Sequence, residues 1–138
     1  MGLLPGTKQI LSKSLQKIVD HINSIQTVYY TKGDNLSTLN RAAQYVLLNE
    51  QSKRLKIVHV YSEKKKIPPS IWYQARVIDE IYPNLRIDLV LVKGIFSPEL
   101  VDALSKRFGI QKNQMFIGTP GGNFPHKIES LGGVRVVI

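Results

Sequence analysis

The chain has 138 residues, 43% of them hydrophobic and 21% charged, and it contains no cysteine. This length fits one domain with a single core. Without cysteine there is neither a disulfide framework nor a thiolate metal site, as is usual for a reducing compartment. No run of 18 apolar residues is present, so no transmembrane helix is predicted. His21, His59 and His126 are too far apart to indicate a shared metal on one helix, and no metal site is predicted.

Positive charge is concentrated in the first half of the chain. Nineteen Lys and Arg against ten Asp and Glu give a formal net charge of +9. Residues 1–66 contain eleven basic and four acidic residues, a net +7, whereas residues 67–138 contain eight and six, a net +2. This asymmetry indicates an anionic partner, nucleic acid or a lipid surface, although such runs often form only a solvated face. No DNA- or RNA-binding motif accompanies the charge, so no nucleic-acid partner is predicted.

Residues 1–25 are expected to form a helical segment ahead of the main domain. Between residues 7 and 25, apolar residues recur at steps of three and four, the period of one helix face. Lys8, Lys13 and Lys17 lie off this stripe. The helix either packs on the core, connects the domain to another part, or pairs with another helix. The stripe consists of Ile10, Leu11, Leu15, Ile18, Val19, Ile22 and Ile25.

Residues 26–138 are predicted to be one domain in which strands and helices alternate. The strands are short β-branched, aromatic or aliphatic runs, and the segments between them have helical spacing. The strands are expected at 27–31, 55–61, 85–92, 114–118 and 134–138, and the helices at 36–48, at 70–82, after Ser97 and around 124–131.

Capping residues mark the ends of these helices. Asp34 or Asn35 is placed to cap the first helix of the domain. Ser97 is a good N-cap, and Pro98 suits the first helical position that follows it. Gly109 is expected just after the end of the same helix, where a left-handed backbone is common.

Helical crossovers between strands predict a parallel sheet with helices on both faces, which is a three-layer α/β sandwich. Charged strands belong at the edges of such a sheet. Arg86 and Asp88 interrupt the third strand and Arg135 the fifth, so the predicted order is 3-2-1-4-5. Lys56 and His59 in the second strand count against this order, and Lys56 is expected near the mouth of its strand.

Two loops are predicted to meet where the strand order reverses, between strands one and four, which is where such sheets bind ligands. Their glycines leave backbone N–H groups open and a helix begins after each, which favours an anion or nucleotide site. Lys32 adds positive charge, and Asp34 is suited to accept a hydrogen bond from a ribose hydroxyl. The candidate ligand residues are Thr31, Lys32, Asp34, Gly118, Thr119, Gly121 and Gly122.

The same glycines are also explained by a tight turn alone, because neither a GxxxxGK[ST] nor a GxGxxG motif is present. Catalysis has less support still. The serines fall at loops and caps, no GxSxG occurs, and His59 reads as a packed strand residue. His126 is expected in the first turn of a helix, where the dipole disfavours its charged form. We therefore predict no enzyme activity, no catalytic residue and no cofactor.

The architecture resembles the universal stress protein fold, with KIVHVY in the second strand and a Gly-rich loop leading through a short helix into VRVVI. This resemblance implies an adenine-nucleotide binder, a family in which the signature is G-x2-G-x9-G-[ST]. Gly118-x2-Gly121 fits the signature. Gly132 comes one residue later than the signature requires, and Gly133 stands where it has Ser or Thr.

A closer resemblance is to the soluble C-terminal domain of bacterial permeases of the amino acid–polyamine–organocation superfamily, over about residues 26–138. It is carried by the segments VYYTKGDNLSTLNRAAQYVLLNEQSKRLKIVHVY, YPNLRIDLVLVKGIFSPELVDALSKRFGI and MFIGTPGGNFPHKIESLGGVRVVI. This resemblance implies a non-enzymatic regulatory or self-association domain at the cytoplasmic face of the cell membrane. The stand-alone nucleotide binder is the alternative.

The permease resemblance also implies partners. These are the transmembrane part of the same transporter and anionic lipid of the inner leaflet, with residues 7–25 as a juxtamembrane helix. Cytoplasmic segments near membrane ends carry excess Lys and Arg, which places Lys8, Lys13 and Lys17 beside that leaflet. A homodimer is also expected, because the last strand ends at a sheet edge with open backbone groups.

Overall fold

The computed structural model describes residues 13–18, 25–33, 35–118 and 127–137. Five strands form one sheet in the order β3-β2-β1-β4-β5, and every neighbouring pair is parallel. The predicted parallel α/β sheet and its strand order are therefore confirmed. The strands are β1 (Thr27–Thr31), β2 (Arg54–Tyr61), β3 (Arg86–Lys93), β4 (Met115–Ile117) and β5 (Arg135–Val136).

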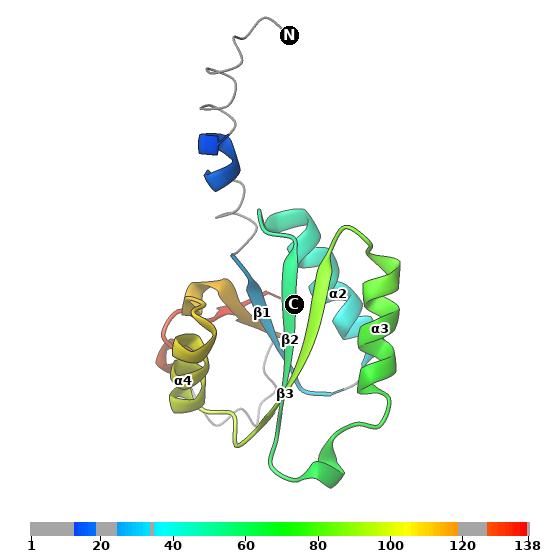
Figure 1. The fold of residues 1–138 in the computed structure, drawn as a ribbon. Coiled ribbons are helices and arrows are strands. Elements are labelled where there is room, and N and C mark those ends of the chain that lie inside the picture. Colours follow the sequence, from blue (N-terminus) through cyan, green and yellow to red (C-terminus); the bar gives the residue numbers. More distant parts are fainter. Residues whose placement is uncertain (1–12, 19–24, 34, 119–126, 138) are drawn as a thin grey trace, which may run out of the picture.

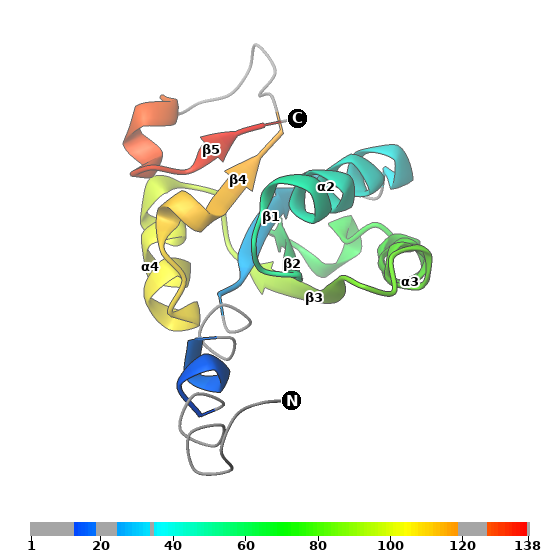
Figure 2. The same cartoon turned by 90° about the horizontal axis from the view of Figure 1, so that it is seen from above.

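Helices cover both faces of the sheet and make three layers (Figures 1 and 2). One face is covered by α2 (Leu36–Asn49) and α3 (Ile71–Ile81). The other is covered by α4 (Pro98–Phe108) and the 3-10 helix η3 (Ile128–Leu131). Two further single turns, η1 (Lys64–Lys66) and η2 (Lys112–Gln114), precede α3 and β4.

The central strand β1 is buried along its whole length. Val28 and Tyr30 point into the apolar cluster under α4, and Tyr29 points into the cluster under α2 and α3. Successive side chains of a strand face opposite sides, so a strand covered on both faces is largely apolar on both, and here only the two terminal threonines are polar. This explains why TVYYT forms the interior strand of the sheet.

Charged residues sit at the two edge strands, as predicted. No residue of β3 is fully buried, which accommodates Arg86 and Asp88. On β5, a guanidinium nitrogen of Arg135 lies 2.6 Å from a carboxylate oxygen of Glu50, and the other donates a hydrogen bond to the Tyr45 hydroxyl at 2.7 Å. The ion pair joins the last strand to the end of α2 and satisfies the partly buried charge.

Lys56 and His59, the residues that counted against an interior position for β2, are accommodated in different ways, and Arg54 is the first residue of the strand. Lys56 is the third residue of β2 and lies near its amino end, with Nζ 5.1 Å from the ring centroid of Phe108, which is cation–π geometry. His59 is buried, and its Nδ1 lies 3.3 Å from the carbonyl oxygen of Thr31. Neither residue prevents β2 from lying inside the sheet.

The predicted caps are present where the structure describes them. Asn35 Oδ1 accepts a hydrogen bond from Thr38 N at 3.2 Å, so Asn35 caps α2, and Asp34 lies outside the described residues. Ser97 Oγ accepts from Leu100 N at 3.1 Å. Gly109 ends α4 with φ 65°, a left-handed conformation that favours glycine.

The N-terminal segment differs in part from its prediction. Residues 13–18 are helical and exposed, and they lie beyond the amino end of β1 (Figure 1). They do not pack on the core. Ile25 and Gln26 are not helical, so the helix expected over 7–25 ends before residue 25; residues 1–12 and 19–24 lie outside the described part. Among the described residues, no helix is long and apolar enough to cross a bilayer.

Burial of Phe116 at the centre of β4 can be tested by substitution. Its ring is fully buried, and its centroid lies 5.1 Å from the ring centroid of Tyr29 and 5.1 Å from that of Tyr45. Phe116→Ala is expected to lower the free energy of unfolding by about 3–5 kcal/mol in denaturant titrations, because it leaves a cavity in the core. Trp72→Ala is the matched control. That ring is 59% exposed, and its loss should cost less than about 1 kcal/mol. Equal losses in the two variants would contradict the packing described.

Candidate anion site at the carboxyl edge of the sheet

The ends of β1 and β4 lie side by side where the strand order reverses. Tyr30 is paired with Ile117, so the next residues, Thr31 and Gly118, emerge at the same level. We call this side of the sheet, where the strands end, the carboxyl edge, and the opposite side the amino edge. The two predicted loops therefore start together, as the topology required.

A side-chain turn shapes the first loop. Thr31 Oγ1 donates to the carbonyl of Gly33 at 2.9 Å and accepts from the amide of Gly33 at 3.3 Å. Lys32 stands exposed at the tip of this turn. A Cβ built at Gly33 would meet no heavy atom within 4 Å, so space beside the backbone is open.

The carboxyl edge is electropositive. α2, α3 and α4 each begin there, because each helix follows a parallel strand, and helix N-termini carry partial positive charge. The first turns of α2 and α3 hold no acidic residue, and that of α4 holds Glu99. Glu63 lies beside the basic turn η1, where Lys65 Nζ is 3.3 Å from its carboxylate. The described lysines of this edge are Lys32, Lys64, Lys65, Lys66 and Lys93.

Buried aromatic and imidazole side chains pack around the end of β1, next to the first loop. His59 lies against the Thr31 carbonyl, and the Tyr30 hydroxyl donates to Met115 Sδ at 3.0 Å. The Tyr30 ring packs on Phe96 with centroids 5.2 Å apart. Burial raises the pKa of the Tyr30 phenol, and burial also raises the pKa of Tyr29, so both phenols stay protonated and are not available as bases.

Several predicted site residues lie outside the described part of the chain. The structure brings together Thr31, Lys32 and Gly118 but gives no position for the rest of the second loop. Outside the described residues are Asp34, Thr119, Gly121, Gly122 and Lys8, together with His126. Lys13 and Lys17 are exposed, and the helical turn 13–18 that contains them lies beyond the amino edge, away from this site (Figure 1).

The last two glycines compared with the nucleotide signature lie at the opposite end of the sheet from Gly118. Gly132 and Gly133 directly precede β5, which runs parallel to β4, so they lie at the amino edge. A Cβ on Gly132 would come within 2.9 Å of the Lys112 side chain, which belongs to the turn before β4. Gly132 has φ 72°, so the helix end and this close packing explain its identity.

Lys112 also organises this amino-edge corner. Its Nζ lies 2.9 Å from Asp102 Oδ1, and Lys106 Nζ lies 3.1 Å from Asp102 Oδ2. Hydrogen bonding from Lys112, then from Lys106, holds the pKa of the Asp102 carboxyl below its usual value. This ion-pair cluster lies at the amino edge, opposite the ends of β1 and β4.

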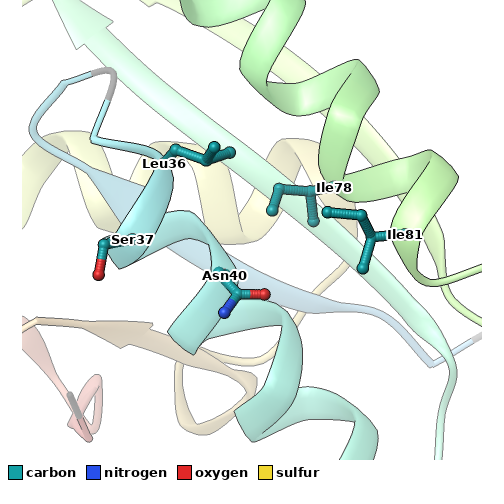
Figure 3. A pocket seen from close by; sticks show the side chains of 5 residues that line it. All are labelled: Leu36, Ser37, Asn40, Ile78 and Ile81. Carbon is teal, nitrogen blue, oxygen red and sulfur yellow. The ribbon is translucent and has the colours of Figure 1, made fainter.

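The sequence analysis did not find a shallow apolar cavity of about 440 Å³ between α2 and α3 (Figure 3). Its polar lining residues are Ser37 and Asn40, and the Asn40 amide oxygen accepts a hydrogen bond from the Tyr82 hydroxyl. Leu36 and Ser37 belong to the first turn of α2, so this cavity begins beside the loop after β1 and extends along α3. The only available signal was Leu36, an apolar residue at the first position of a helix. The lining residues are Leu36, Ser37, Asn40, Ile78 and Ile81.

Three serine hydroxyls among the described residues are engaged in structural hydrogen bonds. Ser97 Oγ caps α4, Ser105 Oγ donates to the carbonyl of Ile110 at 2.6 Å, and Ser130 Oγ donates to the carbonyl of Lys127 at 2.6 Å. Within the same described residues, no three acidic or histidine side chains are grouped to hold a metal ion.

Comparison with known proteins identifies the fold. A universal stress protein solved in complex with cAMP superposes with a TM-score of 0.53 at 14% sequence identity, over 83% of this chain and 95% of that one. The chain has a universal stress protein-like fold. At this identity the likeness concerns the fold alone. No protein-family model and no curated protein matches the sequence, so the permease resemblance gains no support from these comparisons.

The raised tyrosine pKa values predict a loss of stability in alkali. The phenols of an unfolded chain ionise near pH 10, whereas the folded protein keeps Tyr29 and Tyr30 protonated. The free energy of unfolding should therefore be unaffected by these groups below about pH 10 and fall above it. In denaturant titrations at several pH values, Tyr30→Phe should reduce that slope, because no phenol remains to ionise. Tyr73→Phe, at an exposed residue, should leave the slope unchanged; an unchanged slope in Tyr30→Phe would contradict the burial argument.

Proposed function

We propose that this protein is a non-enzymatic domain that binds an adenine nucleotide at the carboxyl edge, between the ends of β1 and β4. The observation that carries the proposal is the meeting of Thr31 and Gly118 at the switch point of this sheet. The similar universal stress protein was solved with cAMP, which is a nucleotide of this class. Sheets of this architecture bind ligands beyond the carboxyl ends of their strands.

The first loop supplies the groups that a phosphate requires. Lys32 is exposed at the tip of the loop, the Thr31 hydroxyl holds the turn, and α2 begins at Asn35 with no acidic residue in its first turn. Backbone N–H groups at a helix N-terminus, a nearby lysine and an open glycine favour an anion. The surrounding lysines raise the local concentration of an anionic ligand further.

The ligand is expected to carry one phosphate rather than three. Gly132 and Gly133 lie at the amino edge, so they contribute no donors to a ligand held beside Gly118. The cradle is left with the Thr31–Gly33 turn, the start of α2 and the loop after Gly118. Without donors from Gly132 and Gly133, we expect a small anion such as the cyclic phosphate of cAMP or the single phosphate of AMP rather than a triphosphate chain.

Titration calorimetry with cAMP, AMP and ATP tests the site. We expect heat with cAMP or AMP, and Lys32→Ala should weaken binding by about tenfold, the equivalent of one modest charged contact. Lys106→Ala removes the same charge from α4, far from the carboxyl edge, and should leave binding unchanged. Absence of heat at millimolar ligand, or equal weakening in both variants, would refute the proposed site.

A second candidate is the cytoplasmic domain of an amino acid permease-like transporter, at the inner face of the cell membrane. It is favoured by the resemblance over residues 26–138 and by the helical turn 13–18, which is exposed and stands at the amino edge. In this proposal the chain leaves toward the transporter at one end and binds its ligand at the other. Lys8, Lys13 and Lys17 would approach anionic lipid.

Sedimentation with lipid vesicles tests this second candidate. The protein should sediment with anionic vesicles at low salt and be released by high salt, because surface charge attraction is screened. Lys13→Ala/Lys17→Ala should reduce the bound fraction, whereas Lys64→Ala/Lys65→Ala, an equal charge change at the carboxyl edge, should not. Equal sedimentation with neutral and anionic vesicles would remove the membrane contact of the candidate.

A further inference from the structure

His59 is a buried polar residue in the interior of an apolar strand. It belongs to β2, is 5% exposed, and stands between Val58 and Val60. A polar side chain in such a position costs stability unless it finds a hydrogen-bond partner, whereas an aliphatic side chain would fill the space without that requirement. The bond that this imidazole forms therefore indicates why a histidine stands here.

The partner of the imidazole is the last residue of β1. In the register of β1 and β2, the Cα of His59 is opposite that of Thr31, and His59 Nδ1 lies 3.3 Å from the Thr31 carbonyl oxygen. β4 pairs with β1 only as far as Tyr30. The imidazole therefore bonds β1 one residue beyond the end of its pairing with β4, at the start of the first loop.

This contact determines which ring nitrogen carries the proton. A carbonyl oxygen only accepts hydrogen bonds, so His59 Nδ1 is the donor and carries the N–H. In the neutral ring the other nitrogen, Nε2, then has a lone pair and no proton. This tautomer is a property of the chain by itself, and it can be measured without any ligand.

The Thr31 carbonyl belongs to the same peptide group as the Lys32 N–H. A trans peptide group is planar, with its N–H directed opposite to its C=O, and the described chain contains no cis peptide bond. A bond to the carbonyl therefore also fixes the direction of the Lys32 N–H. On its other side Thr31 is held by its hydroxyl, which donates to the Gly33 carbonyl at 2.9 Å and accepts from the Gly33 amide at 3.3 Å.

We propose that His59 is a positioning residue of the anion site at the carboxyl edge. Through its bond to the Thr31 carbonyl it orients the Lys32 backbone N–H, so that this donor is in place before a phosphate arrives. The inference rests on the proposed function and adds to it the group that holds the first loop. A donor that is already oriented loses little freedom on binding, which raises the affinity for the ligand.

The tautomer of His59 tests the contact itself. Long-range proton–nitrogen correlation spectra of the imidazole rings, recorded on the wild-type chain in mildly alkaline buffer, show which nitrogen is protonated, and the signals missing from His59→Asn identify the ring. We expect a proton on Nδ1 and none on Nε2. A ring protonated at Nε2 alone would overturn the inference, because Nδ1 could not then donate to Thr31.

Amide resonances of the unliganded protein test the effect on the loop. His59→Leu removes the donor and should shift the amides of Lys32 and Gly33. His59→Asn keeps an N–H donor on the same side-chain carbon, Cγ, and should hold these amides near their wild-type positions. Thr27→Val is the matched control. It removes another buried polar group, which has no hydrogen-bond partner among the described residues, at the far end of β1, and it should not move the two amides.

Calorimetry with cAMP then tests the consequence for binding. His59→Leu should weaken binding by about tenfold, whereas His59→Asn and Thr27→Val should stay within about threefold of the wild type. Loop amides that stay in place in His59→Leu, or an unchanged affinity in that variant, would overturn the inference and leave the proposed function standing. Absence of heat with the wild-type chain would instead refute the proposed function, and the ring and amide spectra would still decide whether His59 holds the loop.

Discussion

Burial of β1 on both faces is the constraint on which the rest of the structure depends. All five residues of TVYYT are buried, and β2 and β4 pair with the strand on its two sides. From β1 the chain first builds β2 and β3 on one side of the strand, and it then returns to add β4 and β5 on the other side. The strand order reverses there, so Thr31 and Gly118 must emerge together. The meeting of the two loops at the candidate site follows from this arrangement rather than from any single motif.

Much of the fold could be predicted from residues that fit both their own helix or strand and the place of that element in the sheet. Arg135 is a charged residue within an apolar strand, and at the edge of the sheet it forms an ion pair with Glu50. Asn35 and Ser97 accept hydrogen bonds from backbone N–H groups of their own helices, so these caps do not depend on where the helices pack. Other features depend on contacts between elements, which the spacing of residues along the chain does not reveal. The length of β5 is an example, since only two of its residues pair with β4, opposite Phe116 and Ile117.

The meeting of the ends of β1 and β4 could be predicted from the sequence, whereas the surroundings of the glycines could not. Gly132 comes one residue later than the nucleotide signature requires, and the structure explains this glycine by another role: it precedes β5 and packs against Lys112 at the amino edge. The basic first half of the chain is likewise divided in space. Lys32 follows β1 at the carboxyl edge, whereas the helical turn 13–18, which contains Lys13 and Lys17, lies beyond the amino edge (Figure 1). The net charge counted along the sequence is therefore divided between two separate surfaces.

The central claim is that a small anionic nucleotide lies between the ends of β1 and β4. Backbone amide resonances recorded by NMR during titration with cAMP test it most directly, because each amide reports its own position. The account predicts that the largest shift changes fall on Thr31, Lys32, Gly33 and Gly118, while the amides of Gly132 and Gly133 stay in place. Changes confined to Leu36 and Ile81 beside the α2/α3 cavity, or to Gly132 and Gly133, would contradict it, as would a spectrum that does not respond.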